Sequence, residues 1–259
     1  MAREPDDLNW IEGLTFQVGD APRVVVRTFN GRVELLSGDP GVVRAEATIR
    51  NPSRVAYAVS QSGNTITVQA IGKSAFSLFG AFAGVDVVIT APAATALDVE
   101  TNNGRIEVDG FTRGGELVTS NGKVEVTRSG GDLSVKTTNG KVTVERFSGK
   151  AHLKTSNRQI VLDDVMGTFD AQTTNGRVTF GGELEAGGEN WIKSTNGGVA
   201  VVLGGKPSVR LDASTSNGRV KSSLPIAATT TKRSHLVGTI GDGEANLEVR
   251  TSNGSVTIK

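Results

Sequence analysis

The sequence predicts an all-β protein, a parallel β-helix (β-solenoid) with coils of about 18 residues and a less regular β-rich N-terminal section. Two observations predict it. A motif of Thr, a small hydroxyl residue, Asn, Gly, a basic residue and Val recurs along the chain, and apolar residues alternate with polar ones on both sides of it. The motif asparagines are Asn103, Asn121, Asn139, Asn157, Asn175, Asn196, Asn217 and Asn253, at spacings of 18, 18, 18, 18, 21, 21 and 36 residues.

The alternation makes each copy a strand, a corner and a second strand. Apolar residues stand four before the asparagine, as at Leu117 and Val135, and three and five after it, as at Val124 and Val126. An Asn-Gly hairpin meander also fits this pattern. We favour the solenoid because the same residue recurs at the same phase, which stacked coils explain through a ladder of side-chain amides.

The corner residues lead to three expectations. The glycine after each asparagine is expected to adopt a positive φ. Asn157 is followed instead by Arg158, so that corner is expected to be strained or differently turned. The threonines two before the asparagines are expected to point inward and to share hydroxyl hydrogen bonds along the stack.

The spacing also predicts the organisation of the chain. Residues 1–12 form an N-terminal tail and residues 13–259 a single solenoid domain, with an irregular section over 13–95 and regular repeats over 96–259. Asn30 marks an outlying first copy, and insertions are expected at "GGELEAGGEN" and "LGGKPS". The spacing of 36 indicates a coil without the motif. No capping helix is evident at "GSVTIK", so the final coil is expected to be exposed at the end of the stack as an assembly surface, unless the N-terminal segment or another chain covers it. Phe76, Phe79 and Phe82 are expected to plug the core or cover an edge.

Composition excludes several classes of function. The chain has 28 basic and 27 acidic residues, so no global field attracts nucleic acid or an anionic membrane. It has no cysteine, which excludes disulfides and thiolate metal sites. The start, "MAREPDDLNW", does not resemble a signal peptide, and no transmembrane segment is expected, so as written the chain reads as cytoplasmic.

No catalytic motif is present, and we expect no enzyme activity, cofactor or metal. His152 and His235 lie on different repeats without a partner at metal-ligand spacing; His152 is expected at the surface and His235 as a corner substitute. The alternative is a carbohydrate-active β-helix enzyme, a lyase or hydrolase, that uses outer-face carboxylates. The acidic candidates are the adjacent Asp163 and Asp164, and a set at one shared outward phase: Asp98, Glu116, Asp170 and Asp212.

The strongest surface feature is a basic residue two positions after the asparagine. This candidate polyanion-binding stripe comprises Arg32, Arg105, Lys123, Lys141, Arg177 and Arg219, interrupted by Gln159 and Gly198. It predicts a linear track for an acidic polymer such as an anionic glycan; the alternative is a solvated edge that discourages sheet aggregation. Nucleic acid is not expected, because aromatic residues do not interleave with the bases.

The repeated "T[ST]NG[KR]V.V", the stretch "VVITAPAATALDVETNNGRIEV" and the ending "HLVGTIGDGEANLEVRTSNGSVTIK" resemble the DUF4097 family of adhesin-like β-strand repeat proteins, over residues 16–259. The resemblance implies a β-solenoid fold, a role often associated with the bacterial envelope, and no catalytic residues. We therefore expect a non-catalytic adhesin-like or scaffold module that presents a flat, repetitive face to a polysaccharide or protein partner, with a homo-oligomer left open.

Overall fold

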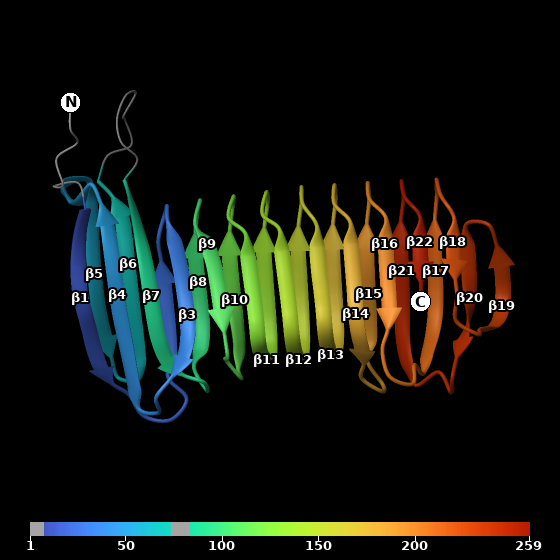
Figure 1. Cartoon of the computed structure of the whole chain (residues 1–259), viewed down its shortest axis with the longest axis horizontal. Helices are drawn as coiled ribbons and strands as arrows, with labels where there is room; N and C mark the ends of the chain where they lie inside the picture. The colour runs from blue at the N-terminus through green and yellow to red at the C-terminus, as the bar shows by residue number, and fades with distance from the viewer. Residues whose placement is uncertain (1–7, 74–82) are drawn as a thin grey trace, which may run out of the picture.

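Consecutive 18-residue copies lie directly over one another in the structure, a computed structural model that describes residues 8–73 and 83–259 (Figure 1). Val124 pairs with Val142, and Val142 pairs with Ile160, in parallel ladders whose register is the sequence repeat itself. The parallel solenoid is therefore confirmed, and an antiparallel meander of these copies is excluded.

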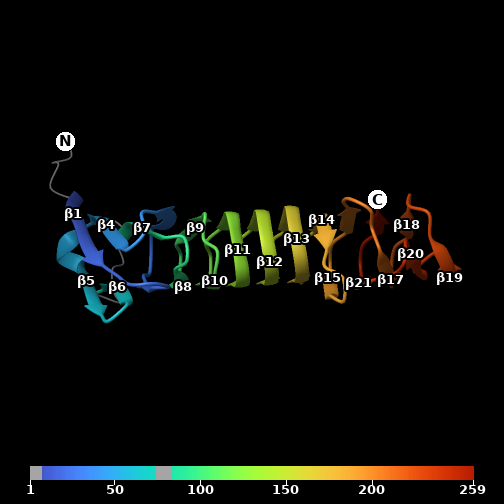
Figure 2. The ribbon, with the colours of Figure 1, turned by 90° about the horizontal axis from the view of Figure 1, so that it is seen from below.

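The coils form two facing sheets (Figure 2). We call the strands that lead into the asparagine corner the pre-corner sheet. In spatial order they are β6 (Thr65–Gly72), β2 (Arg23–Arg27), β8 (Ala96–Thr101), β10 (Gly114–Thr119), the second halves of β11 (Val124–Thr137), β12 (Val142–Thr155) and β13 (Ile160–Thr173), then β15 (Glu189–Ser194), β21 (Ala245–Thr251) and β17 (Val209–Thr215).

The strands that leave the corner form the post-corner sheet. They are β7 (Gly84–Pro92), β3 (Arg32–Gly38), β9 (Arg105–Asp109), the first halves of β11, β12 and β13, then β14 (Val178–Leu184), β16 (Val199–Leu203), β22 (Val256–Ile258) and β18 (Val220–Ser222). The insertions predicted from the 21-residue spacings are the loops 185–188 and 204–208, which join the two sheets at the side away from the asparagines.

The core lies between the two sheets because every second side chain of each strand points inward. Val124, Val142, Ile160 and Val178, which occupy the same position in successive coils, are all fully buried. Phe169 and Phe180 meet edge to face in this core, with ring centroids 5.5 Å apart. The apolar ladders predicted by the alternation are therefore the inner walls of the solenoid.

Antiparallel strands cover both ends of the stack. At one end β4 (Val42–Arg50) pairs with β7, β1 (Leu8–Gln17) pairs with β4, and β5 (Val55–Ser62) pairs with β6 after a 3-10 turn at Pro52–Arg54. Strand β1 thus begins inside the segment that was expected to be a tail, because its backbone pairs with β4 from Leu8 onward. Phe76, Phe79 and Phe82 lie outside the described residues.

At the other end, two sequence-based expectations are wrong. The residues between Asn217 and Asn253 do not form a coil without the motif: β20 (His235–Ile240) pairs antiparallel with β17, and β19 (Ala227–Lys232) pairs with β20. The last coil is not exposed either. Strand β21 lies between β15 and β17, and β22 lies between β16 and β18, so Ile258 is fully buried.

The order of the coils in space therefore differs from their order in the chain. The coil of β2 and β3 is likewise inserted between the coil of β6 and β7 and the coil of β8 and β9. Leu224 and Ile226, which precede β19, pack against the core and help to close its end. Sequence spacing could not reveal either insertion, because every motif copy fits every position in the stack.

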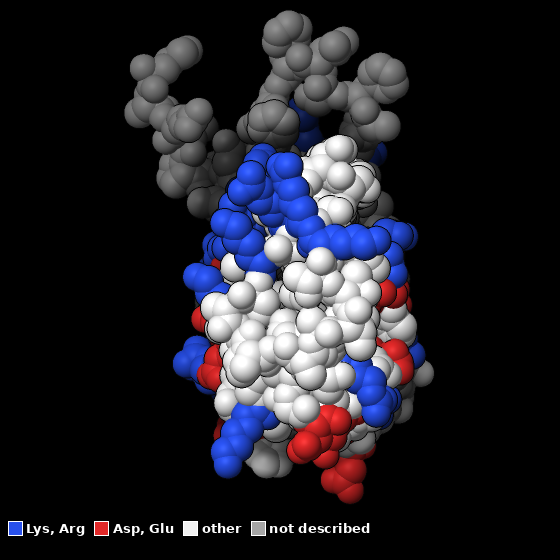
Figure 3. Space-filling model, turned by 90° about the vertical axis from the view of Figure 1, so that its right-hand side faces the viewer, with Lys and Arg blue, Asp and Glu red and all other residues white. Residues whose placement is uncertain are grey.

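The outer edge of β19 carries features that discourage pairing with another strand. Its register with β20 is broken between Ala228 and Thr230, Pro225 stands just before it, and Lys232 is its last residue. Bulges, prolines and lysines are the usual protection of a free edge. Figure 3 shows this end of the molecule: its middle is uncharged, and Lys and Arg gather at the upper side, where the asparagine corners lie in Figure 1.

Candidate functional site

The corner asparagines form one continuous ladder of side-chain amides. From Asn103 onward, each Nδ2 donates to the Oδ1 of the preceding asparagine in the ladder at 2.5–2.8 Å. The spatial order is Asn30, Asn103, Asn121, Asn139, Asn157, Asn175, Asn196, Asn253 and Asn217. With coils about 4.8 Å apart, the nine amides span about 38 Å. We call the exposed rim along this ladder the asparagine edge.

Glycine is needed at these corners for a reason that the sequence analysis did not give. Of the glycines that follow ladder asparagines, Gly31 alone has a positive φ, of 121°. The others are required by close approach: a Cβ on Gly122 would lie 1.6 Å from the carbonyl oxygen of Gly104, and one on Gly140 would lie 1.7 Å from that of Gly122. Arg158 does not have a positive φ, and the ladder passes unbroken through Asn157.

The buried threonines fix the corners through the backbone and not through one another. Thr155 Oγ1 donates to the carbonyl oxygen of Gly140 in the preceding coil at 2.9 Å, and Thr119 makes the same contact with Gly104 at 3.0 Å. The expected ladder of hydroxyl groups is therefore replaced by side chain–backbone bonds. Because these bonds join successive coils, they hold the asparagine edge straight and in register.

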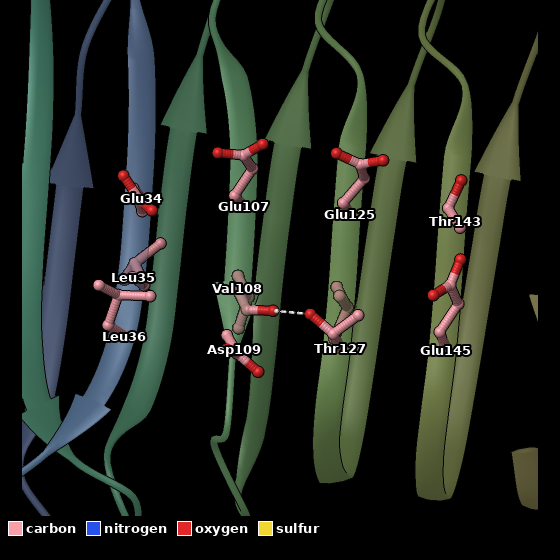
Figure 4. A pocket seen from close by; sticks show the side chains of 11 residues that line it. Glu34, Leu35, Leu36, Glu107, Val108, Asp109, Glu125, Thr127, Thr143 and Glu145 are labelled. Carbon is pink, nitrogen blue, oxygen red and sulfur yellow. Dashed lines mark hydrogen bonds between the residues drawn. The ribbon is translucent and has the colours of Figure 1, made fainter.

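On the post-corner flank, the first half of the basic stripe is neutralised. Figure 4 shows Glu34, Glu107 and Glu125 in one row on β3, β9 and β11. Arg105 contacts both Glu107 and Glu125, Lys123 contacts Glu125, and Arg32 contacts Glu34 at 2.6 Å. Partial burial of Glu125 opposes ionisation, but the hydrogen bonds from Lys123 and Arg105 hold its pKa below the usual value. These bases are therefore engaged with carboxylates.

The carboxylate row ends at β12, where Thr143 takes the place of the glutamates (Figure 4). Around this point five basic residues near the edge have no ion pair within residues 8–73 and 83–259. They are Lys141 and Arg177 of the predicted stripe, Arg158 at the corner, and Lys136 and Lys154 on the pre-corner flank. We call these five residues the central cationic segment. They belong to the three consecutive coils of Asn139, Asn157 and Asn175.

The sequence analysis missed the basic residues of the pre-corner flank, although they stand three positions before the asparagine in several copies. Lys136 pairs in register with Lys154, Lys154 with Gln172, and Lys193 with Arg250. Beside them runs a row of hydroxyl side chains: Ser120, Thr138, Ser156, Thr174, Thr195, Ser252 and Ser216. Part of this flank is a hollow of about 580 Å³, which is lined by Lys154, Lys193, Arg250 and, from the hydroxyl row, Thr174, Thr195, Ser216 and Ser252.

The charges of this hollow are partly balanced. Hydrogen bonds from Arg250, at 2.6 Å, and from Lys193 lower the pKa of Glu248. Arg219, the last residue of the predicted stripe, does not join the central cationic segment. Its coil is separated from that of Arg177 by two coils that carry Gly198 and Ser255 at the equivalent position. The stripe is therefore divided into a neutralised part, an unpaired part and one outlying arginine.

Both histidines have an acidic neighbour, and His152 is exposed, as expected. His152 Nδ1 lies 2.9 Å from Asp170 Oδ2, and His235 Nε2 lies 3.0 Å from Asp212 Oδ1. His235 begins the antiparallel strand β20 and is not a corner residue.

Ser134 is the register neighbour of His152, so a serine, a histidine and an aspartate share one row. Ser134 makes no hydrogen bond to His152. The backbone amides around Ser134 are hydrogen-bonded in the parallel ladders of β10, β11 and β12, so they do not form an oxyanion hole. No group of three acidic or histidine side chains within the described ranges could hold a metal ion.

The Toastrack DUF4097 family model matches residues 24–259. The chain belongs to this family. A search of the curated proteins finds no match to this Toastrack chain. Among the described residues, no helix is long and apolar enough to cross a membrane.

Several solved structures are similar over nearly their whole length, at low identity. A candidate adhesin from Bacteroides fragilis is 11% identical, with 97% of each chain covered and a TM-score of 0.39. A candidate adhesin from Parabacteroides distasonis is 13% identical, with 97% of each chain covered and a TM-score of 0.33. A candidate cell adhesion protein from Clostridium sporogenes is 10% identical, covering 96% of this chain and 98% of the other, with a TM-score of 0.28.

Proposed function

We propose that this Toastrack domain is a non-catalytic binding module whose asparagine edge binds a linear acidic polysaccharide. The observation that carries the proposal is the central cationic segment. Between three residues before and four residues after Asn139, Asn157 and Asn175, the sequence contains five basic residues and no Asp or Glu. Unpaired cations of this density are available to a ligand, whereas those beside Glu107 and Glu125 are not.

The dimensions of the segment suit a polymer better than a small anion. Its three coils extend over about 10 Å of the edge, which is close to the Debye length of about 8 Å at physiological ionic strength. The five cations therefore act together on a ligand that follows the edge. The ladder amides and the neighbouring hydroxyl row offer hydrogen-bond donors and acceptors at every coil, which matches a repeating chain of hydroxyl and carboxylate groups.

Nucleic acid fits this edge less well than a glycan does. Binding of single-stranded nucleic acid usually combines a basic groove with aromatic side chains on which bases stack. The residues of the central cationic segment have only Thr, Ser, Asn, Gln, Gly and aliphatic residues as their sequence neighbours on the edge. A carboxylated polysaccharide is therefore the ligand class that we propose.

The test is titration calorimetry of the full chain with polygalacturonate oligomers, with neutral dextran oligomers as the comparison, between 50 and 500 mM NaCl. Replacing Lys154, Arg158 and Arg177 together by glutamine is expected to weaken binding about tenfold or more, because each exposed charge contact contributes about 0.2–1 kcal/mol. Binding by the unchanged protein is expected to weaken as salt rises.

A matched control removes three exposed lysines far from the segment, Lys206, Lys221 and Lys259, and so changes the net charge by the same amount. Its affinity is expected to stay within about twofold of the unchanged protein. Equal losses in the two triple variants would assign the effect to net charge alone and overturn the proposal. So would binding of dextran as strong as that of polygalacturonate.

A further inference from the structure

An exposed tryptophan stands among polar neighbours on the outer face of the pre-corner sheet. Trp191 lies on β15, where its register neighbours are Asp170 on β13 and Glu248 on β21. Its side chain points outward, and the residue keeps 36% of its surface exposed. The packing of the core does not require this residue, because Asn190 and Ile192 are the buried neighbours.

Trp191 separates two hollows in this face. One, of about 440 Å³, extends over β11, β12 and β13 and is lined by Ser134, His152, Asp170 and Glu189 among others. The other, of about 350 Å³, extends over β17, β20 and β21 and includes Asp212 and Asn246. Because Trp191 lines both, a ligand that covered the indole would reach polar groups on either side.

The polar groups beside the indole are held in fixed orientations. Asp170 contacts His152 at 2.9 Å and accepts a hydrogen bond from Gln172 Nε2 at 2.8 Å. On the other side, Asn246 Nδ2 donates to Glu189 Oε1 at 2.5 Å. Planar carboxylate, imidazole and amide groups that are already oriented can bind neighbouring hydroxyl groups with little loss of side-chain entropy.

We propose that Trp191 and its two hollows form a subsite for a sugar ring of a polysaccharide. A pyranose exposes C–H groups on one face, which pack on an indole, and hydroxyl groups around its rim, which bind oriented polar side chains. Asp170 and His152 bind hydroxyl groups on one side of the ring, and Asn246 and Glu189 bind them on the other. The subsite lies on the sheet face and does not depend on the charges of the asparagine edge.

A protein partner fits this surface less well. An interface centre is usually a contiguous apolar patch around an aromatic anchor. The two hollows beside Trp191 are lined by five carboxylates: Asp132, Asp170, Glu189, Asp212 and Glu248. The exposed apolar residues Met166 and Val202 line a different hollow, so they do not extend the surface of the indole.

The experiment uses the indole as its own reporter. The chain has two tryptophans, and Trp10→Phe leaves Trp191 as the only one. Emission of this full-length variant is measured during titration with cellohexaose, xylohexaose, mannohexaose and chitohexaose in 0.5 M NaCl, where edge charges are screened. At least one of these neutral oligosaccharides is expected to give a saturable change in emission. No change with any of the four would overturn the proposal.

Substitutions in the otherwise unchanged chain, measured by calorimetry, separate stacking from indirect effects. Trp191→Ala is expected to abolish the binding, Trp191→Phe to keep most of it, and Asp170→Asn to weaken it about tenfold. Equal affinity of Trp191→Ala and the unchanged protein would overturn the proposal. An emission change that follows protein concentration without saccharide would assign Trp191 to a contact between chains, with the same consequence. Loss of polygalacturonate binding in the edge variants leaves this result unaffected.

Discussion

The position of the last coil can be tested with two isoleucines that the alternative arrangements place in opposite environments. Ile258 lies on β22, between β16 and β18, and is fully buried. Ile226 lies just before the β19–β20 hairpin and is only partly buried against the core. If the coils followed one another in chain order, residue 226 would belong to an inner coil and residue 258 to the exposed end.

The structure predicts the size of both effects. Ile258→Ala removes three carbon atoms from a site without solvent access, which costs about 2.4 kcal/mol of transfer free energy at about 0.8 kcal/mol per carbon. The cavity that remains raises the total toward the range of about 2–5 kcal/mol for buried isoleucine truncations. Ile226→Ala is expected to cost about 1 kcal/mol, because part of its side chain is already in water.

Urea unfolding followed by far-UV circular dichroism measures both free-energy changes against the unchanged protein. The expected result is a midpoint that falls clearly for Ile258→Ala and slightly for Ile226→Ala. The reverse order, with Ile226→Ala the more destabilising variant, would refute the inserted position of β22. Equal and small changes would refute it as well, because they would mean that residue 258 is not enclosed.

Three further predictions concern the corner, an ion pair and the end of the stack. Gly140→Ala is expected to destabilise the protein by about 2–3 kcal/mol or more in urea unfolding, because the new Cβ would meet the carbonyl oxygen of Gly122. Gly19→Ala is a nearly neutral control, because the nearest atom to its new Cβ lies 3.7 Å away. Similar losses of stability in both variants would contradict the close-approach argument. Glu248 has a lowered pKa in the folded protein, so the stability that it contributes is present at neutral pH and is lost as the pH falls below about 4.3. The difference in melting temperature between the unchanged protein and Glu248→Gln should therefore shrink as the pH is lowered from 7 to 3, and a constant difference would count against the ion pair. Static light scattering is expected to find a monomer, with self-association increased by Lys232→Ile, because that lysine protects the edge of β19; an unchanged scattering mass in the variant would argue against this protective role.

The repeat made the stacked coils predictable because its evidence is local. Alternation around Val124 and Val142 identifies the inward positions, and recurrence of the same asparagine at one phase requires equivalent residues to stack. The place of Asn253 in the ladder was not predictable by the same means. Its motif is identical in kind to the others, and the insertion is decided by the whole course of the chain between residues 218 and 244.

The candidate site was predictable in part. The basic stripe was visible in the sequence. Whether each of its members forms an ion pair depends on residues in the same coil and in the adjacent coil. Lys123 and Lys141 occupy the same position one coil apart, yet Lys123 contacts Glu125, and Thr143 replaces the glutamate in the coil of Lys141. The second hollow beside Trp191 could not be read from the sequence, because it depends on β20 and β21, which follow Trp191 by more than forty residues.

The two inserted coils set the order in which the protein can be completed as it is synthesised. Strands β15 and β17 both leave the ribosome before β21, so the space between them has to stay unfilled until residues 245–258 have been made. The coil of β2 and β3 is made before either of its neighbours, so the later coils can be added on both of its sides. At the C-terminal end, by contrast, assembly by adding each new coil to the end of the stack in chain order is impossible, and in the finished molecule both of these coils are held along their two edges and cannot peel away from the stack.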